Sequence, residues 1–271
     1  MQDIKIAIIQ TELLWEDIPG NLSQFDQKIS SIKETVDLII LPEMFNTAFS
    51  MNPAVCAEIP GGTSLQWMKK KAKEKSCVIA GSLLTNESNK YYNRLIWMMQ
   101  DGNYKYYDKK HLFRFAGEHK VFSSGNRKIT APVKGWNIRP LICYDLRFPV
   151  WSMNTFENLP TGQAGGKFEY DCLVYIANWP EKRRDAWMSL LIARAIENQS
   201  YVIGVNRIGT DGKGNSYTGD SMIIAPAGNI LLQIPANKEC TEIFTLSYSE
   251  IQSYREHFRI APDWDKFTIL E

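Results

Sequence analysis

The sequence predicts an α/β fold built from mixed β-sheets that are covered by helices. The first observation behind this prediction is that short apolar runs alternate with segments of helical periodicity along most of the 271 residues. The second is that hairpins interrupt the alternation, and because hairpins join antiparallel strands, they disfavour a purely parallel barrel. No change in composition marks a hinge, and 44% of the residues are hydrophobic, so one domain spanning residues 1–271 is expected.

Two patterns identify the elements of the first half. Strands are short apolar runs bounded by turn residues, such as the run that ends before Pro42. Helices place apolar side chains three or four positions apart, as Leu22, Phe25 and Ile29 do. In chain order, these patterns predict a strand at 4–10, a helix at 21–35, a strand at 36–41, a helix at 64–75, a strand at 77–82 and a hairpin of 92–99 with 103–108.

The second half repeats the alternation. Its predicted elements are strands at 136–144 and 172–178, a helix at 185–199, a strand at 201–207, a strand pair at 221–225 and 229–234, and a last strand at 242–246. Two further segments, 154–169 and 209–219, are rich in glycine and lack an apolar pattern, so both are expected to be surface loops. The first of these loops could cover a pocket or extend an interface.

The charge balance and the cysteines exclude several classes of protein. The formal net charge is +1, from 31 basic and 30 acidic residues, so no large field of one sign can hold nucleic acid or an anionic membrane. No apolar run reaches the length of a membrane span, and the first residues do not resemble a signal peptide. The five scattered cysteines and three histidines lack zinc-site spacing. A cytoplasmic protein with free thiols, no metal and no cofactor is therefore expected.

Three patches each place a reactive side chain at the end of an apolar strand. Glu43 follows Leu-Ile-Ile-Leu-Pro, Lys109 and Lys110 follow Tyr-Tyr-Asp, and Cys143 follows Pro-Leu-Ile. A strand end is held rigidly by its sheet and opens onto a crevice, which suits a catalytic group. Each residue alone has an ordinary explanation, as a loop carboxylate, as surface charge or as a small buried hydrophobe. It is their combination that points to a function.

Together the patches resemble the nitrilase, or carbon–nitrogen hydrolase, superfamily. Its motifs Pro-Glu, Lys-x-His-Leu-Phe and Cys-Tyr-Asp-x-Arg-Phe-Pro occur here in the same order, at Glu43, Lys109 and Cys143. The resemblance implies a single carbon–nitrogen hydrolase domain with a four-layer α-β-β-α sandwich of two mixed sheets flanked by helices. It also implies that Lys109, rather than Lys110, is the functional lysine. Glu118 matches a second glutamate that orients the lysine or the substrate.

The chemistry of amide hydrolysis agrees with these residue types. A thiolate attacks an amide carbonyl well, but a free cysteine is mostly protonated near neutral pH, so Cys143 needs a base. Glu43 can take the thiol proton, pass it to the departing ammonia and then activate water against the thioester. The Lys109 ammonium and the backbone N–H of Tyr144 can hold the oxyanion that forms during attack.

A closer resemblance is to the omega-amidases, on stretches 41–51, 107–114, 142–152, 177–180 and 193–199. These enzymes hydrolyse the terminal amide of 2-oxoglutaramate and 2-oxosuccinamate to the 2-oxo diacid and ammonia. Such a substrate has a free carboxylate and needs a cationic anchor. The candidate anchors are Arg114, Arg183, Arg184 and Arg207. The candidate pocket walls are Asn178 and Trp179, which end a strand beside that of Cys143, and the aromatic residues Phe45, Phe49 and Phe115.

The sequence leaves alternatives open. The substrate could be another small amide, an N-carbamoyl compound or a nitrile, and the chain could be a non-catalytic scaffold that keeps the fold. The resemblance further implies a homodimer or higher homo-oligomer. The helix 185–199 is the candidate interface, because Trp187 and Met188 are expected to broaden its apolar surface. Asp145 and Arg147 are expected to brace the turn after the cysteine as an ion pair.

Overall fold

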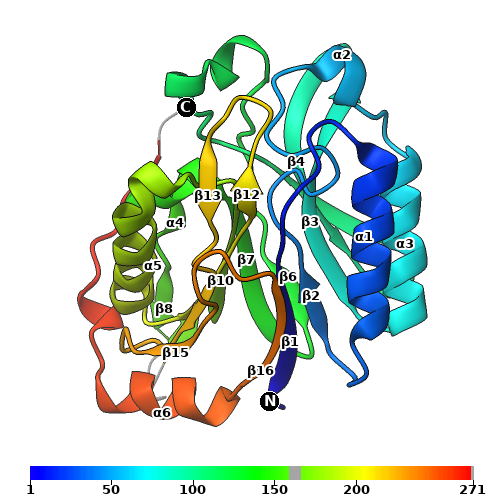
Figure 1. Cartoon of the computed structure of the whole chain (residues 1–271). Helices are drawn as coiled ribbons and strands as arrows, with labels where there is room; N and C mark the ends of the chain where they lie inside the picture. Colours follow the sequence, from blue (N-terminus) through cyan, green and yellow to red (C-terminus); the bar gives the residue numbers. More distant parts are fainter. Residues whose placement is uncertain (159–165, 270–271) are drawn as a thin grey trace.

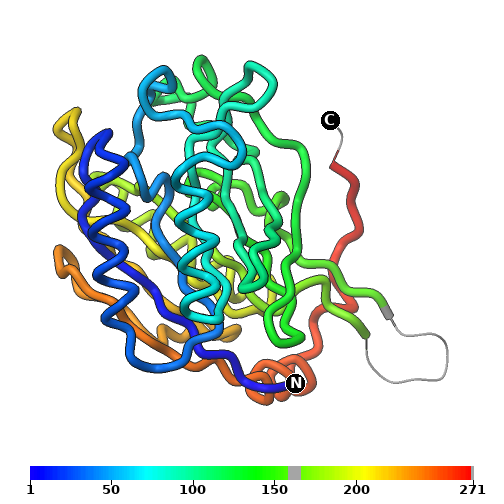
Figure 2. Tube along the Cα trace, turned by 90° about the vertical axis from the view of Figure 1, so that its right-hand side faces the viewer, coloured from blue at the N-terminus to red at the C-terminus, as the bar shows by residue number. Residues whose placement is uncertain are grey.

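Two six-stranded mixed sheets lie face to face between layers of helices in the computed structural model, which describes residues 1–158 and 166–269. Helices α1 (Ile18–Ser31) and α3 (Thr63–Lys75) lie side by side on the outer face of one sheet (Figure 1, and from another side Figure 2). Helix α5 (Arg184–Asn198) covers the outer face of the other sheet (Figure 1). The predicted four-layer α-β-β-α sandwich is therefore confirmed.

The first sheet has the strand order β16-β1-β2-β3-β4-β5. Its three central strands, β1 to β3, are parallel to one another, and the other neighbours pair antiparallel. In sheet order the strands are β16 (Cys240–Leu246), β1 (Ile4–Gln10), β2 (Leu38–Ile40), β3 (Val78–Glu87), β4 (Lys90–Met98) and β5 (Tyr104–Asp108).

The second sheet has the strand order β15-β14-β11-β10-β7-β6. Here β7, β10 and β11 are parallel, and antiparallel strands flank them on both sides. In sheet order the strands are β15 (Ile230–Gln233), β14 (Met222–Ile224), β11 (Tyr201–Asn206), β10 (Cys172–Ala177), β7 (Trp136–Ile142) and β6 (Ala131–Val133).

Alternating side chains explain why the first sheet is buried on both faces. In β1, Ile6 and Ile8 belong to the core between the two sheets. Ala7 and Ile9, on the opposite face of the same strand, pack in the core that includes Phe25 of α1 and residues of α3. Because successive strand residues point to opposite faces, one short apolar run fills both cores.

Each of the two predicted surface loops contains paired strands, so both predictions need correction. Within 209–219, β12 (Ile208–Thr210) pairs antiparallel with β13 (Ser216–Thr218), and Tyr217 of β13 is buried. The described ends of 154–169 form a second hairpin, β8 (Phe156–Asn158) with β9 (Gly166–Phe168). The rings of Phe156 and Phe168 meet edge to face at 5.0 Å, which gives this hairpin an apolar contact. Residues 159–165 lie outside the described residues.

Several boundaries differ from the predicted ones. Helix α1 starts before residue 21, because the Asp17 carboxylate caps it by accepting the Gly20 N–H at 2.9 Å. Strand β3 continues to Glu87 and forms a long hairpin with β4. Three further helices were not predicted, namely α2 (Pro53–Cys56), α4 (Pro149–Ser152) and α6 (Tyr248–His257). Within the described ranges, no helix combines the length and apolar character needed to cross a membrane.

The inner face of α5 holds Trp187, contrary to the prediction that this residue broadens an exposed surface. Trp187 is 1% exposed, its ring centroid lies 5.6 Å from that of Trp179, and its indole N–H donates to the Asp220 carbonyl oxygen at 2.9 Å. Burial of a large ring with a satisfied N–H is the more stable arrangement. Met188 beside it is half-buried.

Candidate active site

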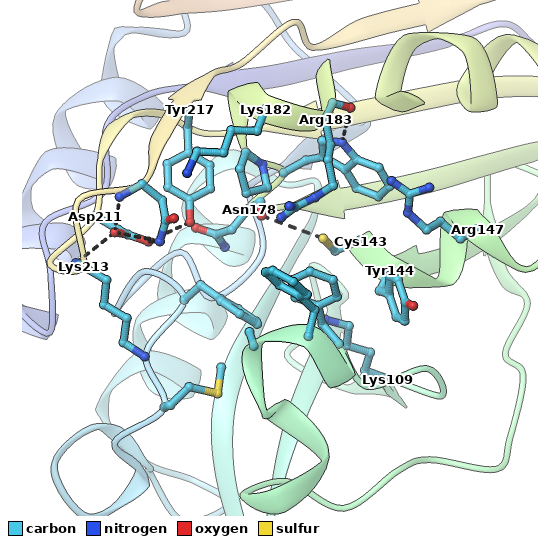
Figure 3. A pocket seen from close by; sticks show the side chains of 18 residues that line it. Lys109, Cys143, Tyr144, Arg147, Asn178, Lys182, Arg183, Asp211, Lys213 and Tyr217 are labelled. Atoms are coloured by element: carbon cyan, nitrogen blue, oxygen red, sulfur yellow. Dashed lines mark hydrogen bonds between the residues drawn. The ribbon is translucent and has the colours of Figure 1, made fainter. Parts of the chain in front are cut away.

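The three motif side chains come from strand ends that meet between the two sheets. Glu43 lies shortly after β2, Lys109 directly follows β5, and Cys143 directly follows β7. Lys109 and Cys143 line a cavity of about 310 Å³ (Figure 3), and the buried Glu43 contacts Lys109 behind its wall. The rigid ends of three strands from both sheets therefore position these groups.

Lys109 is held between two buried carboxylates. Its Nζ lies 2.9 Å from Glu43 Oε1 and 3.0 Å from each carboxylate oxygen of Glu118, and all three side chains are 0% exposed. Asn93 on β4, which sequence reasoning missed, donates its amide to Glu43 at 2.8 Å and to Glu118 at 3.4 Å. The structure thus brings Glu43, Lys109 and Glu118 together. Lys110 lies outside this cluster.

The charges of the cluster oppose the effect of burial. Burial by itself lowers the pKa of Lys109, but Glu118 and Glu43 outweigh it, so the pKa ends above its ordinary value and the lysine remains an ammonium. Burial raises the pKa of Glu118, although the neighbouring Lys109 acts in the opposite direction. A permanently charged ammonium therefore lies beside the thiol.

Cys143 occupies a sharp turn at the end of β7. Its φ of 42° falls in the left-handed region, which costs a non-glycine residue about 1–3 kcal/mol. Asp145 braces the turn, as predicted, by accepting hydrogen bonds from the Ile142 N–H at 3.1 Å, the His111 N–H at 3.0 Å and the Tyr107 hydroxyl at 2.7 Å. These bonds offset the strain and hold the thiol at the cavity.

Arg147 does not form the expected ion pair with Asp145 within the described part of the chain. Its guanidinium lies over the Trp179 ring, 4.8 Å from the centroid, and its side chain lines the cavity. The Asp145 oxygens are already occupied by Tyr107, His111 and Ile142, so the arginine is free to pack on the aromatic face.

The surroundings of Cys143 favour the neutral form of its thiol. Burial raises its pKa well above the ordinary value, the Glu43 carboxylate raises the pKa further, and Lys109 acts in the opposite direction. A neutral thiol is a weak nucleophile, so attack requires a base that removes the proton as the bond forms. Glu43 is the carboxylate with the largest effect on this thiol.

Asn178 links Glu43 to the second sheet. In the parallel pair β7 and β10, Ile142 lies opposite Ile176, which places Asn178 beside Cys143. The Asn178 backbone N–H donates to Glu43 Oε2 at 2.8 Å, and its side-chain amide donates to the Glu43 carbonyl oxygen at 2.6 Å. The Cys143 Sγ lies 3.9 Å from the Asn178 carbonyl oxygen. The position of the carboxylate is thereby fixed from both sheets.

Most of the predicted wall residues line the cavity. Those that do are Phe49, Phe115, Asn178 and Trp179. Tyr144, which was predicted as a backbone donor to the oxyanion, lines the cavity as well. Phe45 does not, because its ring is buried with Phe25 and Trp67 at centroid distances of 5.5 and 5.6 Å, between the first sheet and its helices. The described residues of 154–169 also contribute nothing to the wall of this cavity.

Of the four predicted arginines, Arg183 lines the cavity. Arg114 is exposed and lies outside the lining. Arg184 pairs with Asp220 through two contacts of 2.8 Å. Arg207 is fully buried and donates to backbone carbonyl oxygens, which keeps its guanidinium away from the cavity.

The β12–β13 hairpin forms a cavity wall that sequence reasoning missed. Asp211, Lys213, Asn215 and Tyr217 all line the cavity. The first three lie in the turn between the two strands, so no strand periodicity in the sequence could have indicated them. The Asp211 carboxylate accepts the N–H groups of Lys213 and Asn215 at 2.9 Å each and the Tyr217 hydroxyl at 2.8 Å. The turn is therefore held rigidly over the cavity.

Among the described residues, no group of three or more His, Cys, Asp and Glu side chains is arranged to hold a metal ion. The chemistry available at the site is that of a thiol, a carboxylate and an ammonium, which together can perform covalent attack on a carbonyl.

Comparisons with known proteins agree with this geometry. Residues 5–256 match the family model described as carbon-nitrogen hydrolase. The sequence is 40% identical over 269 residues to the omega-amidase YafV of Escherichia coli strain K12, covering 99% of this chain and 100% of the relative. It is 32% identical over 231 residues to the 2-oxoglutaramate amidase of Bacillus subtilis strain 168, covering 84% and 85% of the two chains.

A solved structure has the same fold as this chain over nearly the whole length of both. It is the crystal structure of a CN-hydrolase superfamily protein from Xanthomonas campestris with an arsenic adduct in the active site. The two chains are 36% identical with a TM-score of 0.94, and the match covers 99% of this chain and 100% of the other. The chain therefore belongs to the carbon–nitrogen hydrolase family, within the nitrilase superfamily, and is an amidase.

Proposed function

We propose that this amidase is an omega-amidase, which hydrolyses the terminal amide of 2-oxoglutaramate or 2-oxosuccinamate through a thioester on Cys143. The observation that carries the proposal is that the buried thiol shares its cavity with several cationic side chains. Among the described residues, these cations form no ion pairs. Those side chains are Arg147, Lys182, Arg183 and Lys213. One carboxylate, Asp211, opposes them, so the cavity suits a substrate that carries a negative charge.

Formation of the thioester is the first half of the proposed reaction. As Sγ of Cys143 attacks the amide carbon, its proton passes to the Glu43 carboxylate. The carbonyl oxygen becomes an oxyanion, which the Lys109 ammonium and the Tyr144 backbone N–H stabilise. Glu43 then gives the proton to the amide nitrogen, the carbon–nitrogen bond breaks, and ammonia leaves.

Hydrolysis of the thioester is the second half. Glu43 removes a proton from water, and the hydroxide attacks the thioester carbon. Collapse of the second tetrahedral intermediate breaks the carbon–sulfur bond, and Glu43 returns the proton to the thiolate. In this proposal Glu118 and Asn93 are positioning residues, because they contact Lys109 or Glu43 rather than the cavity.

Ammonia release from a panel of amides tests the proposed substrate. We expect kcat/KM for 2-oxoglutaramate to exceed that for glutamine, which lacks the 2-oxo group, by about 10²-fold or more. N-carbamoyl compounds and nitriles of similar length belong in the same panel. Faster turnover of any of these would replace the proposed substrate, and a lack of turnover of 2-oxoglutaramate would refute the omega-amidase proposal.

Replacing Glu43 with glutamine tests its role as the base. Glu43 raises the pKa of the Cys143 thiol and Lys109 opposes it, so removal of this negative charge is expected to lower the thiol pKa. Alkylation of Cys143 by iodoacetamide, followed by peptide mass spectrometry across pH, should therefore have its midpoint at lower pH than in the wild type. In the same variant kcat should fall by about 10²–10⁴-fold.

The matched control is Glu181→Gln, because Glu181 is exposed near the cavity but outside its lining. It should leave both measurements unchanged. A Glu43→Gln variant that alkylates at a higher pH than the wild type, or that keeps its kcat, would contradict the assignment of Glu43 as the base.

A further inference from the structure

Besides Lys109, which is paired with two glutamates, four cationic side chains line the cavity, and their surroundings differ. Lys182 and Lys213 are exposed at the rim, so their ammonium groups remain hydrated. Arg147 is half-buried, but its guanidinium is already packed on the Trp179 ring, 4.8 Å from the ring centroid. Arg183 is also half-buried, and its side chain extends into the cavity toward Cys143 (Figure 3).

The main chain of Arg183 is held by the turn that ends β10. Its backbone N–H donates to the Pro180 carbonyl oxygen at 3.0 Å, and its own carbonyl oxygen accepts the Trp179 indole N–H at 2.7 Å. Trp179 is 3% exposed, so this bond is anchored in the core. The origin of the arginine side chain is thus fixed relative to the strand that lies beside Cys143.

The guanidinium of Arg183 reaches the opposite wall of the cavity. Its central carbon lies 5.1 Å from the ring centroid of Phe113 and 5.9 Å from that of Phe115, both on the segment between Lys109 and Glu118. No carboxylate pairs with it among the described residues. Aromatic faces hold the plane of a guanidinium but leave its N–H donors along the edge available for a ligand.

We propose that Arg183 is the specificity-determining residue that binds the carboxylate of the substrate at the end remote from the scissile amide. This inference rests on the proposed function for the presence of that carboxylate. A planar guanidinium matches a carboxylate with two parallel N–H bonds, and partial burial strengthens such a charged pair relative to one in open water. Bound in this way, the substrate lies between Arg183 and the thiol with its amide directed toward Cys143.

Substitution of Arg183 should change substrate preference rather than the chemistry. For Arg183→Met we expect kcat/KM for 2-oxoglutaramate to fall by about 10- to 100-fold, mainly through KM, because one charged hydrogen-bonded contact is lost. Hydrolysis of pentanamide, which has a chain of the same length but no carboxylate, should change by less than about threefold. Arg183→Lys keeps the positive charge but lacks the planar guanidinium with its two parallel N–H donors. Its preference for 2-oxoglutaramate over pentanamide should therefore lie between those of the wild type and Arg183→Met.

Arg114→Met is the matched control, because Arg114 is exposed and does not line the cavity. It should leave the ratio of kcat/KM for the two amides unchanged. Retained pentanamide hydrolysis by Arg183→Met also shows that the variant is folded. If that activity is lost, the ratio of kcat/KM for the two amides in Arg183→Lys decides whether Arg183 binds the carboxylate.

The outcomes separate the two proposals. If the wild type prefers 2-oxoglutaramate and both Arg183 variants keep the full preference, the anchor is wrong and the proposed function stands. If the wild type hydrolyses pentanamide as well as 2-oxoglutaramate, the carboxylate substrate and its anchor are both overturned. Loss of the preference in the Arg183 variants alone supports the anchor.

Discussion

Cys143→Ala is expected to reduce amide hydrolysis by about 10⁵-fold or more, because the variant lacks the thiol that forms the covalent intermediate in the proposed mechanism. Alanine removes only the sulfur at a position whose backbone is held by Asp145 and its donors, so the fold should be kept. Ammonia release measures the activity, and the thermal midpoint of unfolding shows that the loss is chemical rather than structural.

A thioester on the wild-type enzyme is the direct counterpart of this loss. Rapid acid quenching during turnover, followed by mass spectrometry, should place the acyl group on the peptide that contains Cys143. Cys240 is the matched control, because it is half-buried whereas the other four cysteines are buried. Cys240→Ala should keep full activity. An active Cys143→Ala variant, or an acyl group on another cysteine, would refute the assignment of the nucleophile.

The central groups of the site could be predicted because each is local to a strand end. Glu43, Lys109 and Cys143 all stand in short motifs, and strand ends of a sandwich of sheets converge on a crevice. Asn93 could not be found in this way. It reaches Lys109 through the register of β4 with β5, where the Lys109 N–H donates to the Asn93 carbonyl oxygen at 3.0 Å, and register depends on tertiary packing.

The orientation of neighbouring residues was the other limit of sequence reasoning. Arg183 and Arg184 are adjacent, yet the first faces the cavity and the second pairs with Asp220, since α5 begins between them and turns the chain. In the same helix, Trp187 faces the core because a satisfied indole is more stable inside than outside. The segment 209–219 was expected to be a loop because glycines obscure its apolar pattern, but the two short, partly exposed strands of this hairpin need few apolar residues.

Lys109→Met should combine a large loss of activity with a large loss of stability. The ammonium lines the same cavity as the thiol and can stabilise an oxyanion there, and removal of such a donor costs about 10²–10³-fold in rate. The same change leaves Glu43 and Glu118 buried without their shared cation. Breaking a buried ion pair by removing one partner lowers the free energy of unfolding by about 3–5 kcal/mol.

The loss of stability should depend on pH in a defined direction. Burial and Glu43 raise the pKa of Glu118 in the wild type, and the Lys109 charge opposes them more strongly than the hydrogen bond from the Phe113 N–H does. Without Lys109 the folded-state pKa rises further above the unfolded value of about 4.3. Such a group stabilises the fold fully below the unfolded pKa, and its contribution is lost as the pH rises through the folded pKa. The variant should therefore lose more of its free energy of unfolding at pH 7 than at pH 5.

Lys110→Met provides the comparison at the adjacent position. The Lys110 ammonium lies 5.3 Å from the centroid of the Trp151 ring and pairs with no carboxylate among the described residues, so its loss should cost less than about 1 kcal/mol and leave kcat unchanged. Urea unfolding of both variants at the two pH values, with ammonia release at each, measures the effects. Two results would mean that Lys109 does not balance the charge of the two glutamates. One is an equal loss of activity and stability in both variants, and the other is a free energy of unfolding of Lys109→Met that does not fall between pH 5 and pH 7.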